Sequence, residues 1–168
     1  ADLMNGNFIQ TNSVVYRWRF REGLPDWFRP DVCPGDFYWH MLHAETGKIG
    51  FIPEIMSVYR RHANAFYAKA FTSSMELRRD HGMAELAAYH AYNEHFGNRY
   101  FRSLSRLANG VFEDFLRIHL LENDDRLFNA AVEKYPEFAK SFLKDLKQQS
   151  VATRAPGAPT GEPRPEGQ

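Results

Sequence analysis

In the segment from Pro34 to His62, the candidates for transfer chemistry are Asp36 and His62. A carboxylate can remove a proton from an attacking hydroxyl, and a neutral imidazole can bind a divalent metal. Each also has a plain structural explanation. Asp36 follows a Pro-Gly pair and suits the N-cap of a helix, a role worth about 1 kcal/mol, whereas His62 suits an ordinary surface or packed position. The cap and the base are compatible roles for Asp36, because the positive end of a helix favours the ionised carboxylate that accepts a proton.

The elements around Asp36 follow from proline, glycine and apolar spacing. Residues 23–36 hold three prolines and two glycines, which predicts an irregular loop. A helix is expected over about Phe37–Thr46, with Asp36 at its N-cap and Gly47 as its stop signal. Loops of this kind often carry functional residues, so the start of this helix is the candidate site.

Strand-like patterns flank this helix on both sides. Residues 8–21 are β-like, and residues 48–52 and 55–60 read as two short strands around Pro53-Glu54. Three aromatic residues alternate with three arginines: Tyr16, Trp18 and Phe20 with Arg17, Arg19 and Arg21. One face of a strand would then be aromatic and the other basic. The simpler explanation of the basic face is the solvated side of an edge strand, and phosphate binding is the alternative. A short helical turn from Trp18 onward is a second possible structure for this segment.

Beyond residue 66 the patterns become helical. Helices are expected over residues 83–97, 100–121, 125–134 and 137–147, with Pro136 suited to a first turn. Apolar residues recur at spacings of three and four in the second of these and predict a core stripe: Phe101, Leu104, Ala108, Val111, Phe112 and Phe115. Residues 151–168 carry four prolines and three glycines and are expected to be disordered.

Composition excludes several classes of function. The chain has 168 residues, 43% of them hydrophobic, which is enough for one hydrophobic core. Its 21 basic and 21 acidic residues balance, so no net electrostatic field attracts nucleic acid. Cys33 is the single cysteine, so an internal disulfide is impossible and a reducing compartment is expected. No apolar run approaches the length of a membrane span. The start at Ala1, close to strand-like sequence, leads us to expect further sequence upstream.

Other candidate motifs have structural explanations. His40 and His43 share a helix face but lack a zinc signature, and the spacing of His90 and His95 places them on different faces. The acidic run 122–125 joins two expected helices and suits a cap. No nucleophile elbow or phosphate-binding glycine loop is present, so hydrolase and kinase functions lack support.

Several sequence segments, taken in their order along the chain, resemble a known protein family. "NFIQTNSVVYR", "LPDWF" and "PGDFYWHMLHAETGKIGFIPEIMSVYRRH" together resemble the C-terminal half of the catalytic domain of family-two glycosyltransferases, which have the GT-A fold. The resemblance covers about residues 5–66. It implies an α/β fold for residues 1–66, the acceptor and catalytic-base part of such a domain, followed by a helical extension over residues 67–150 and the disordered tail over 151–168.

The resemblance also implies roles for individual residues. Asp36 corresponds to the general base of an inverting transfer from a nucleotide-sugar to an acceptor hydroxyl. His62 corresponds to a metal or diphosphate contact, and Arg60 and Arg61 would lie near the donor phosphates. The implied cofactor is Mg²⁺ or Mn²⁺, with its remaining ligands in the upstream nucleotide-binding half, which this chain lacks. Gly35 stands where many members have a second acidic residue.

Aromatic residues near Asp36 complete the expected site. Trp27 and Trp39 are the candidates for stacking on a saccharide acceptor, with core packing as the alternative. The resulting hypothesis is a cytoplasmic, metal-dependent glycosyltransferase fragment of polysaccharide biosynthesis, inactive alone, without nucleic-acid partners and peripherally associated with the inner face of the membrane. The rival hypothesis is a non-catalytic helical interaction module, residues 67–150, that docks a partner of polysaccharide assembly.

Overall fold

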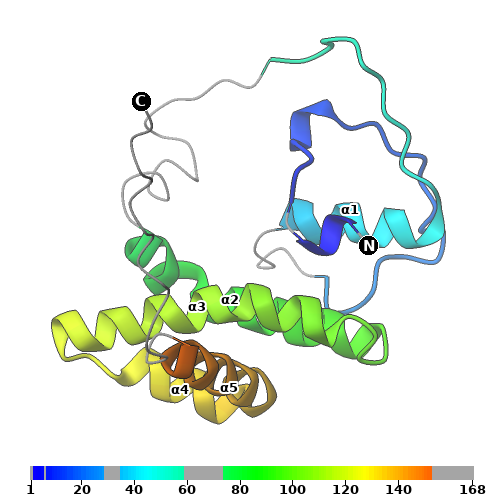
Figure 1. The fold of residues 1–168 in the computed structure, drawn as a ribbon. Coiled ribbons are helices and arrows are strands. Elements are labelled where there is room, and N and C mark those ends of the chain that lie inside the picture. Colours follow the sequence, from blue (N-terminus) through cyan, green and yellow to red (C-terminus); the bar gives the residue numbers. More distant parts are fainter. Residues whose placement is uncertain (1, 6, 29–34, 59–73, 153–168) are drawn as a thin grey trace, which may run out of the picture.

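The computed structural model describes residues 2–5, 7–28, 35–58 and 74–152 (Figure 1). These segments contain five α-helices and two short 3₁₀ helices. The elements are η1 (Asp2–Asn5), η2 (Thr11–Ser13), α1 (Gly35–Thr46), α2 (Ser74–His95), α3 (Phe101–Glu122), α4 (Arg126–Lys134) and α5 (Pro136–Ala152). None of the helices in these segments has the length and apolar character needed to cross a membrane.

The α/β fold expected for residues 1–66 is wrong, because the described residues form no β-strand. Residues 48–58, where two strands were expected, have no regular structure, and their large apolar side chains are exposed: Ile49, Phe51, Ile52, Ile55, Met56 and Val58. A strand needs a neighbour for its backbone hydrogen bonds. The described residues supply no such neighbour, so the apolar pattern alone does not produce a sheet, and this part of the chain is not a GT-A fold.

The helices after residue 73 form a bundle around α3. Helix α3 packs against α2, α4, α5 and η1. The predicted core stripe is confirmed, since Leu104, Ala108, Val111, Phe112 and Phe115 are buried and Phe101 packs against them. The rings of Phe112 and Phe142 stack with centroids 5.5 Å apart and thereby join α3 to α5. Burial of such aromatic area is the main stabilising term of the bundle.

Helix α1 shares this core. Phe37, Tyr38 and Met41 are buried on its inner side. The Tyr38 ring lies 5.8 Å from the Tyr92 ring of α2, centroid to centroid. The start of α1 is therefore held against the bundle by buried aromatic contacts.

The N-terminal part of α2 was not predicted. Helix α2 begins at Ser74, nine residues before the start expected from the apolar pattern. Its polar first half is fixed by ion pairs, because Arg78 binds Glu85 and also Asp114 of α3, with 3.2 Å from Nε to Oδ2. Burial raises the pKa of Glu85, and the neighbouring Arg78 opposes that rise. The contact with Asp114 comes from another helix and both contacts are between charged groups, so local apolar spacing does not show them.

The helix boundaries after residue 95 agree with the sequence. Between α2 and α3 the backbone is left-handed at Gly97 and Asn98, with φ of 56° and 64°. Helices α4 and α5 confirm the two short helices that were expected, with Pro136 in the first turn of α5 as predicted. The predicted disordered tail lies outside the described residues apart from Val151 and Ala152, which belong to α5.

Replacing Gly82 of α2 by alanine is expected to destabilise the fold. A Cβ atom there would lie 2.7 Å from Cζ of Phe115 and 3.1 Å from Cγ1 of Val111. Overpacking of a core typically costs about 1–3 kcal/mol, which exceeds the gain of up to about 1 kcal/mol from alanine's helix propensity. Urea denaturation followed by circular dichroism should show a lower free energy of unfolding.

Gly110→Ala on α3 is the matched control for Gly82→Ala. No atom lies within 4 Å of a Cβ at Gly110. Only the higher helix propensity of alanine applies at Gly110, so the free energy of unfolding is expected to rise by about 0.5–1 kcal/mol. Equal shifts of the unfolding free energy in the two variants would contradict the close packing of Gly82.

Candidate functional site

The carboxylate of Asp36 is held at the start of α1. Asp36 lies in the first turn of α1, but the helix already begins at Gly35, so Asp36 is not the N-cap residue that the sequence predicted. Its Oδ1 accepts a hydrogen bond from the Phe37 amide at 2.8 Å, and its Oδ2 accepts one from Thr11 Oγ1 at 2.7 Å. Thr11 belongs to η2, so a segment distant in sequence orients the side chain. The half-buried carboxylate therefore has a defined direction and keeps acceptor capacity for a further proton donor.

His40 and Tyr16 lie beside Asp36. His40 follows Asp36 by one helical turn and is 2% exposed, and its Nδ1 shares a hydrogen bond with the Tyr16 hydroxyl. Burial lowers the pKa of His40, which the charge of Asp36 partly offsets. Burial, with the charge of Asp36, raises the pKa of Tyr16 to about 12. The pair is therefore neutral near pH 7 and lies next to the Asp36 carboxylate.

The pairing of Tyr16 with His40 was not predicted from the sequence. His40 was considered only as a zinc ligand together with His43, and Tyr16 only as one residue of an aromatic face. The spacing of four between Asp36 and His40 places both on one face of a helix, and this signal could have identified His40 as a neighbour of Asp36. No sequence signal pairs Tyr16 with His40, because the two residues belong to different segments.

Replacing His40 by glutamine is expected to change how stability depends on pH. The pKa of His40 in the folded chain lies below the ordinary value of 6.5, so the unfolded chain binds more protons as pH falls through 6.5. Stability is thus complete above that value and is lost as the pH falls toward the folded pKa. The unfolding free energy of the wild type, measured by urea between about pH 8 and about pH 5, should fall more steeply on acidification than that of His40→Gln. Parallel curves would show that burial does not perturb His40.

Trp39 is the centre of an aromatic cluster. We call this the Trp39 cluster, and its members are Tyr16, Trp18, Phe20, Phe28, Trp39 and His43. The ring centroids of Phe28 and His43 lie 5.5 and 4.9 Å from that of Trp39. Tyr16, Trp18 and Phe20 also contact Trp39, while the alternating arginines 17, 19 and 21 are exposed. The predicted aromatic and basic faces therefore exist without a strand.

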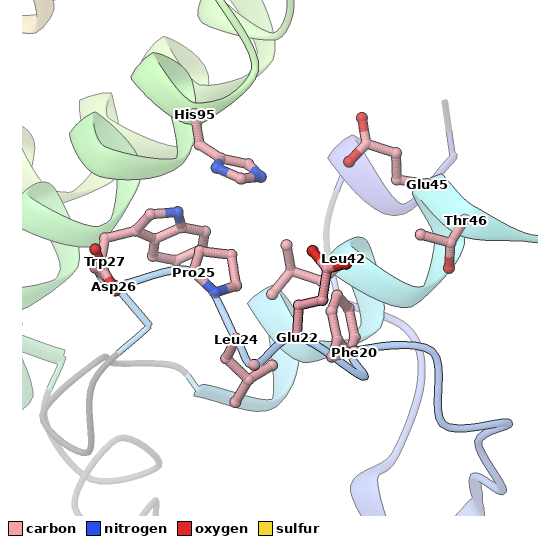
Figure 2. Close-up of a pocket in the computed structure, with 11 residues that line it drawn as sticks. Phe20, Glu22, Leu24, Pro25, Asp26, Trp27, Leu42, Glu45, Thr46 and His95 are labelled. Atoms are coloured by element: carbon pink, nitrogen blue, oxygen red, sulfur yellow. The ribbon is translucent and has the colours of Figure 1, made fainter.

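Trp27 lies away from Asp36, in the wall of a cavity of about 730 Å³ (Figure 2). The lining residues come from three places, namely the loop after Phe20, the C-terminal half of α1 and the end of α2: Phe20, Glu22, Gly23, Leu24, Pro25, Asp26, Trp27, Leu42, Glu45, Thr46 and His95. Among the lining residues of α1, Leu42 follows Asp36 by six residues and Thr46 by ten, which is about 9 and about 15 Å along a helix axis. The structure thus separates the candidate base from the cavity, and of the two predicted acceptor residues only Trp27 lines it.

The expected metal and diphosphate residues, Arg60, Arg61 and His62, lie outside the described residues. Among the residues that the structure does describe, no three histidine, cysteine, aspartate or glutamate side chains gather as a metal site. The acidic run at 122–125 has the structural role that was expected. Asp124 accepts hydrogen bonds from the backbone and the guanidinium of Arg126, and these bonds lower its pKa to about 2.

Comparison with known proteins gives relatives but no function. No family model and no solved structure matches the chain. Over 84 residues it is 46% identical to uncharacterized proteins of Mycobacterium bovis and of two strains of Mycobacterium tuberculosis. The match covers 49% of this chain and 23% of each relative, so the chain matches less than a quarter of the relatives' length.

Proposed function

We propose that this chain supplies the acceptor side of an inverting sugar transferase, with Asp36 as the general base. The observation that carries the proposal is the fixed orientation of the Asp36 carboxylate by Thr11 and Phe37. The resemblance of residues 5–66 to family-two glycosyltransferases supports the same role. The proposal depends on this site and not on the α/β fold, which the described residues do not have.

The proposed step is a displacement at the anomeric carbon of a nucleotide-sugar. The acceptor oxygen forms the new glycosidic bond, the bond from the anomeric carbon to the diphosphate breaks, and the proton of the acceptor hydroxyl passes to Asp36. A positioned base of this kind typically contributes about 100- to 10,000-fold in rate. Tyr16 and His40 are neutral neighbours, so neither pairs with the carboxylate as a cation.

The donor side is proposed to lie elsewhere. Mg²⁺ or Mn²⁺ would stabilise the charge of the leaving diphosphate. The described residues alone do not form a metal site, and His62, Arg60 and Arg61 lie outside them. Nucleotide and metal binding are proposed to involve these three residues together with the nucleotide-binding half that the resemblance implies upstream.

The test is a transfer assay on a full-length protein that contains this chain. A panel of labelled nucleotide-sugars is incubated with saccharide acceptors and with Mg²⁺ or Mn²⁺, and the products are separated from free sugar. Transfer to an acceptor with inversion at the anomeric carbon is the expected result. A folded full-length protein that transfers no sugar from any donor in the panel would overturn the proposal in favour of the helical interaction module.

A further inference from the structure

The cavity beside Trp27 has the volume of a small-molecule binding site. It opens between the loop that follows Phe20, the end of α1 and the end of α2. In Figure 2, Trp27 and His95 lie on one side of it, and Glu45 and Thr46 lie on the other. Its volume of about 730 Å³ is within the range of about 300–1,000 Å³ typical of small-molecule sites.

The aromatic wall of the cavity is held rigidly. The Trp27 ring makes edge contacts with Tyr38, Tyr92 and His95, with centroid distances of 5.9, 5.9 and 5.7 Å. Because neighbours from α1 and α2 fix this ring, a ligand that stacks on it does not have to order it first. Phe20, from the Trp39 cluster, adds a second aromatic side chain to the lining.

Trp27 also has an unpaired polar atom. Its indole Nε1 is buried and finds no hydrogen-bond acceptor in the part of the chain that the structure describes. The nitrogen lies on the side of the ring nearest His95 (Figure 2). Because this nitrogen is shielded from solvent, a ligand in the cavity does not reach it unless the ring moves.

The charge of the lining limits the chemistry of that ligand. Glu22, Asp26 and Glu45 provide carboxylates, and none of the lining residues is lysine or arginine. The C-terminal end of α1 adds a partial negative charge at the same place. Phosphates, nucleotides and uronic acids are therefore disfavoured. Carboxylates accept hydrogen bonds from hydroxyl groups, and the C–H face of a sugar ring packs on the electron-rich face of an indole.

We propose that this cavity binds an uncharged saccharide. The sugar ring stacks on Trp27, and its hydroxyl groups donate hydrogen bonds to Glu22, Asp26 or Glu45. The identification of this saccharide as a remote sugar of the acceptor depends on the proposed function, whereas its binding does not. Because about 9–15 Å of helix α1 separate Asp36 from the lining residues of that helix, such an acceptor would be an oligosaccharide.

The experiment titrates the purified 168-residue chain with neutral trisaccharides of glucose, mannose and galactose, by calorimetry and by tryptophan fluorescence. At least one should bind, and glucuronate-containing trisaccharides should bind at least tenfold more weakly. Asp26→Asn and Glu45→Gln should each weaken binding several-fold, and because both carboxylates are exposed these variants should fold normally. Trp27→Leu should weaken binding at least tenfold. Trp18→Leu, at an exposed tryptophan outside the cavity, is the matched control and should leave binding unchanged.

Three results would overturn the proposal. One is the absence of binding by all neutral trisaccharides at millimolar concentration. Another is binding that Trp27→Leu, Asp26→Asn and Glu45→Gln all leave unchanged. The third is binding of tetramethylammonium without any sugar, which would make the cavity a cation site. Binding of sugars by a full-length protein that shows no transfer would refute the proposed function alone, and transfer without binding at this cavity would refute this inference alone.

Discussion

Under the proposed mechanism, Asp36→Asn should lower the turnover of a full-length protein that contains this chain by about 100-fold or more. An amide has nearly the same shape as a carboxylate, and its oxygen can still accept hydrogen bonds from Thr11 and Phe37, so the fold should be kept. The amide cannot take up the proton of the acceptor hydroxyl. The loss should therefore appear in kcat, with little change in the affinity for the donor. Initial rates over a range of donor concentrations separate these two quantities.

Asp125→Asn is the matched control for Asp36→Asn. Asp125 occupies the N-cap position of α4, is exposed and undergoes the same chemical change at the start of a helix. Its turnover should equal that of the wild type. If Asp36→Asn also keeps normal turnover, Asp36 only stabilises the start of α1 and the proposed mechanism is wrong.

Phe112→Ala should lower the free energy of unfolding by about 3–5 kcal/mol. The Phe112 side chain is fully buried, stacks on Phe142 of α5 and meets the edge of Phe128 of α4 with centroids 6.2 Å apart. Its removal leaves a void where three helices join. Because domains are typically stable by only about 5–15 kcal/mol, the loss is a large fraction of the total. Urea denaturation followed by far-UV circular dichroism measures it.

The control for Phe112→Ala is Leu120→Ala on the same helix. Leu120 is 72% exposed, so its truncation creates no void and should change the unfolding free energy by less than about 0.5 kcal/mol. Similar losses in the two variants would mean that α3 does not bury the predicted stripe.

The helices were predictable from the sequence because their signals are local. Apolar spacing, Pro136 and the position of Asp36 before an apolar pattern depend on residues within a few turns of one another. The N-terminal half of α2 is the exception. The ion pairs of Arg78 with Asp114 and of Arg79 with Glu122, both on α3, stabilise a polar stretch whose own spacing shows no apolar face.

The prediction of β-strands was wrong for a physical reason. Alternation of apolar side chains is necessary for a half-buried strand, but the hydrogen bonds of a sheet must come from another segment. Residues 48–58 satisfy the pattern and have no such segment in the described part of the chain. The expected α/β fold therefore depended on a partner that a local pattern cannot supply.

By itself, the sequence determined that Asp36 stands at a helix start, that α3 has a buried stripe, and that the residues alternating with the arginines form an aromatic face. Tertiary structure alone decided the surroundings of these residues. Tyr16 meets His40, and Trp27 meets His95, because α1 and the loops before it pack on α2. Those pairs are distant in sequence, and their contacts depend on how the helices pack together, which periodicity and capping do not specify.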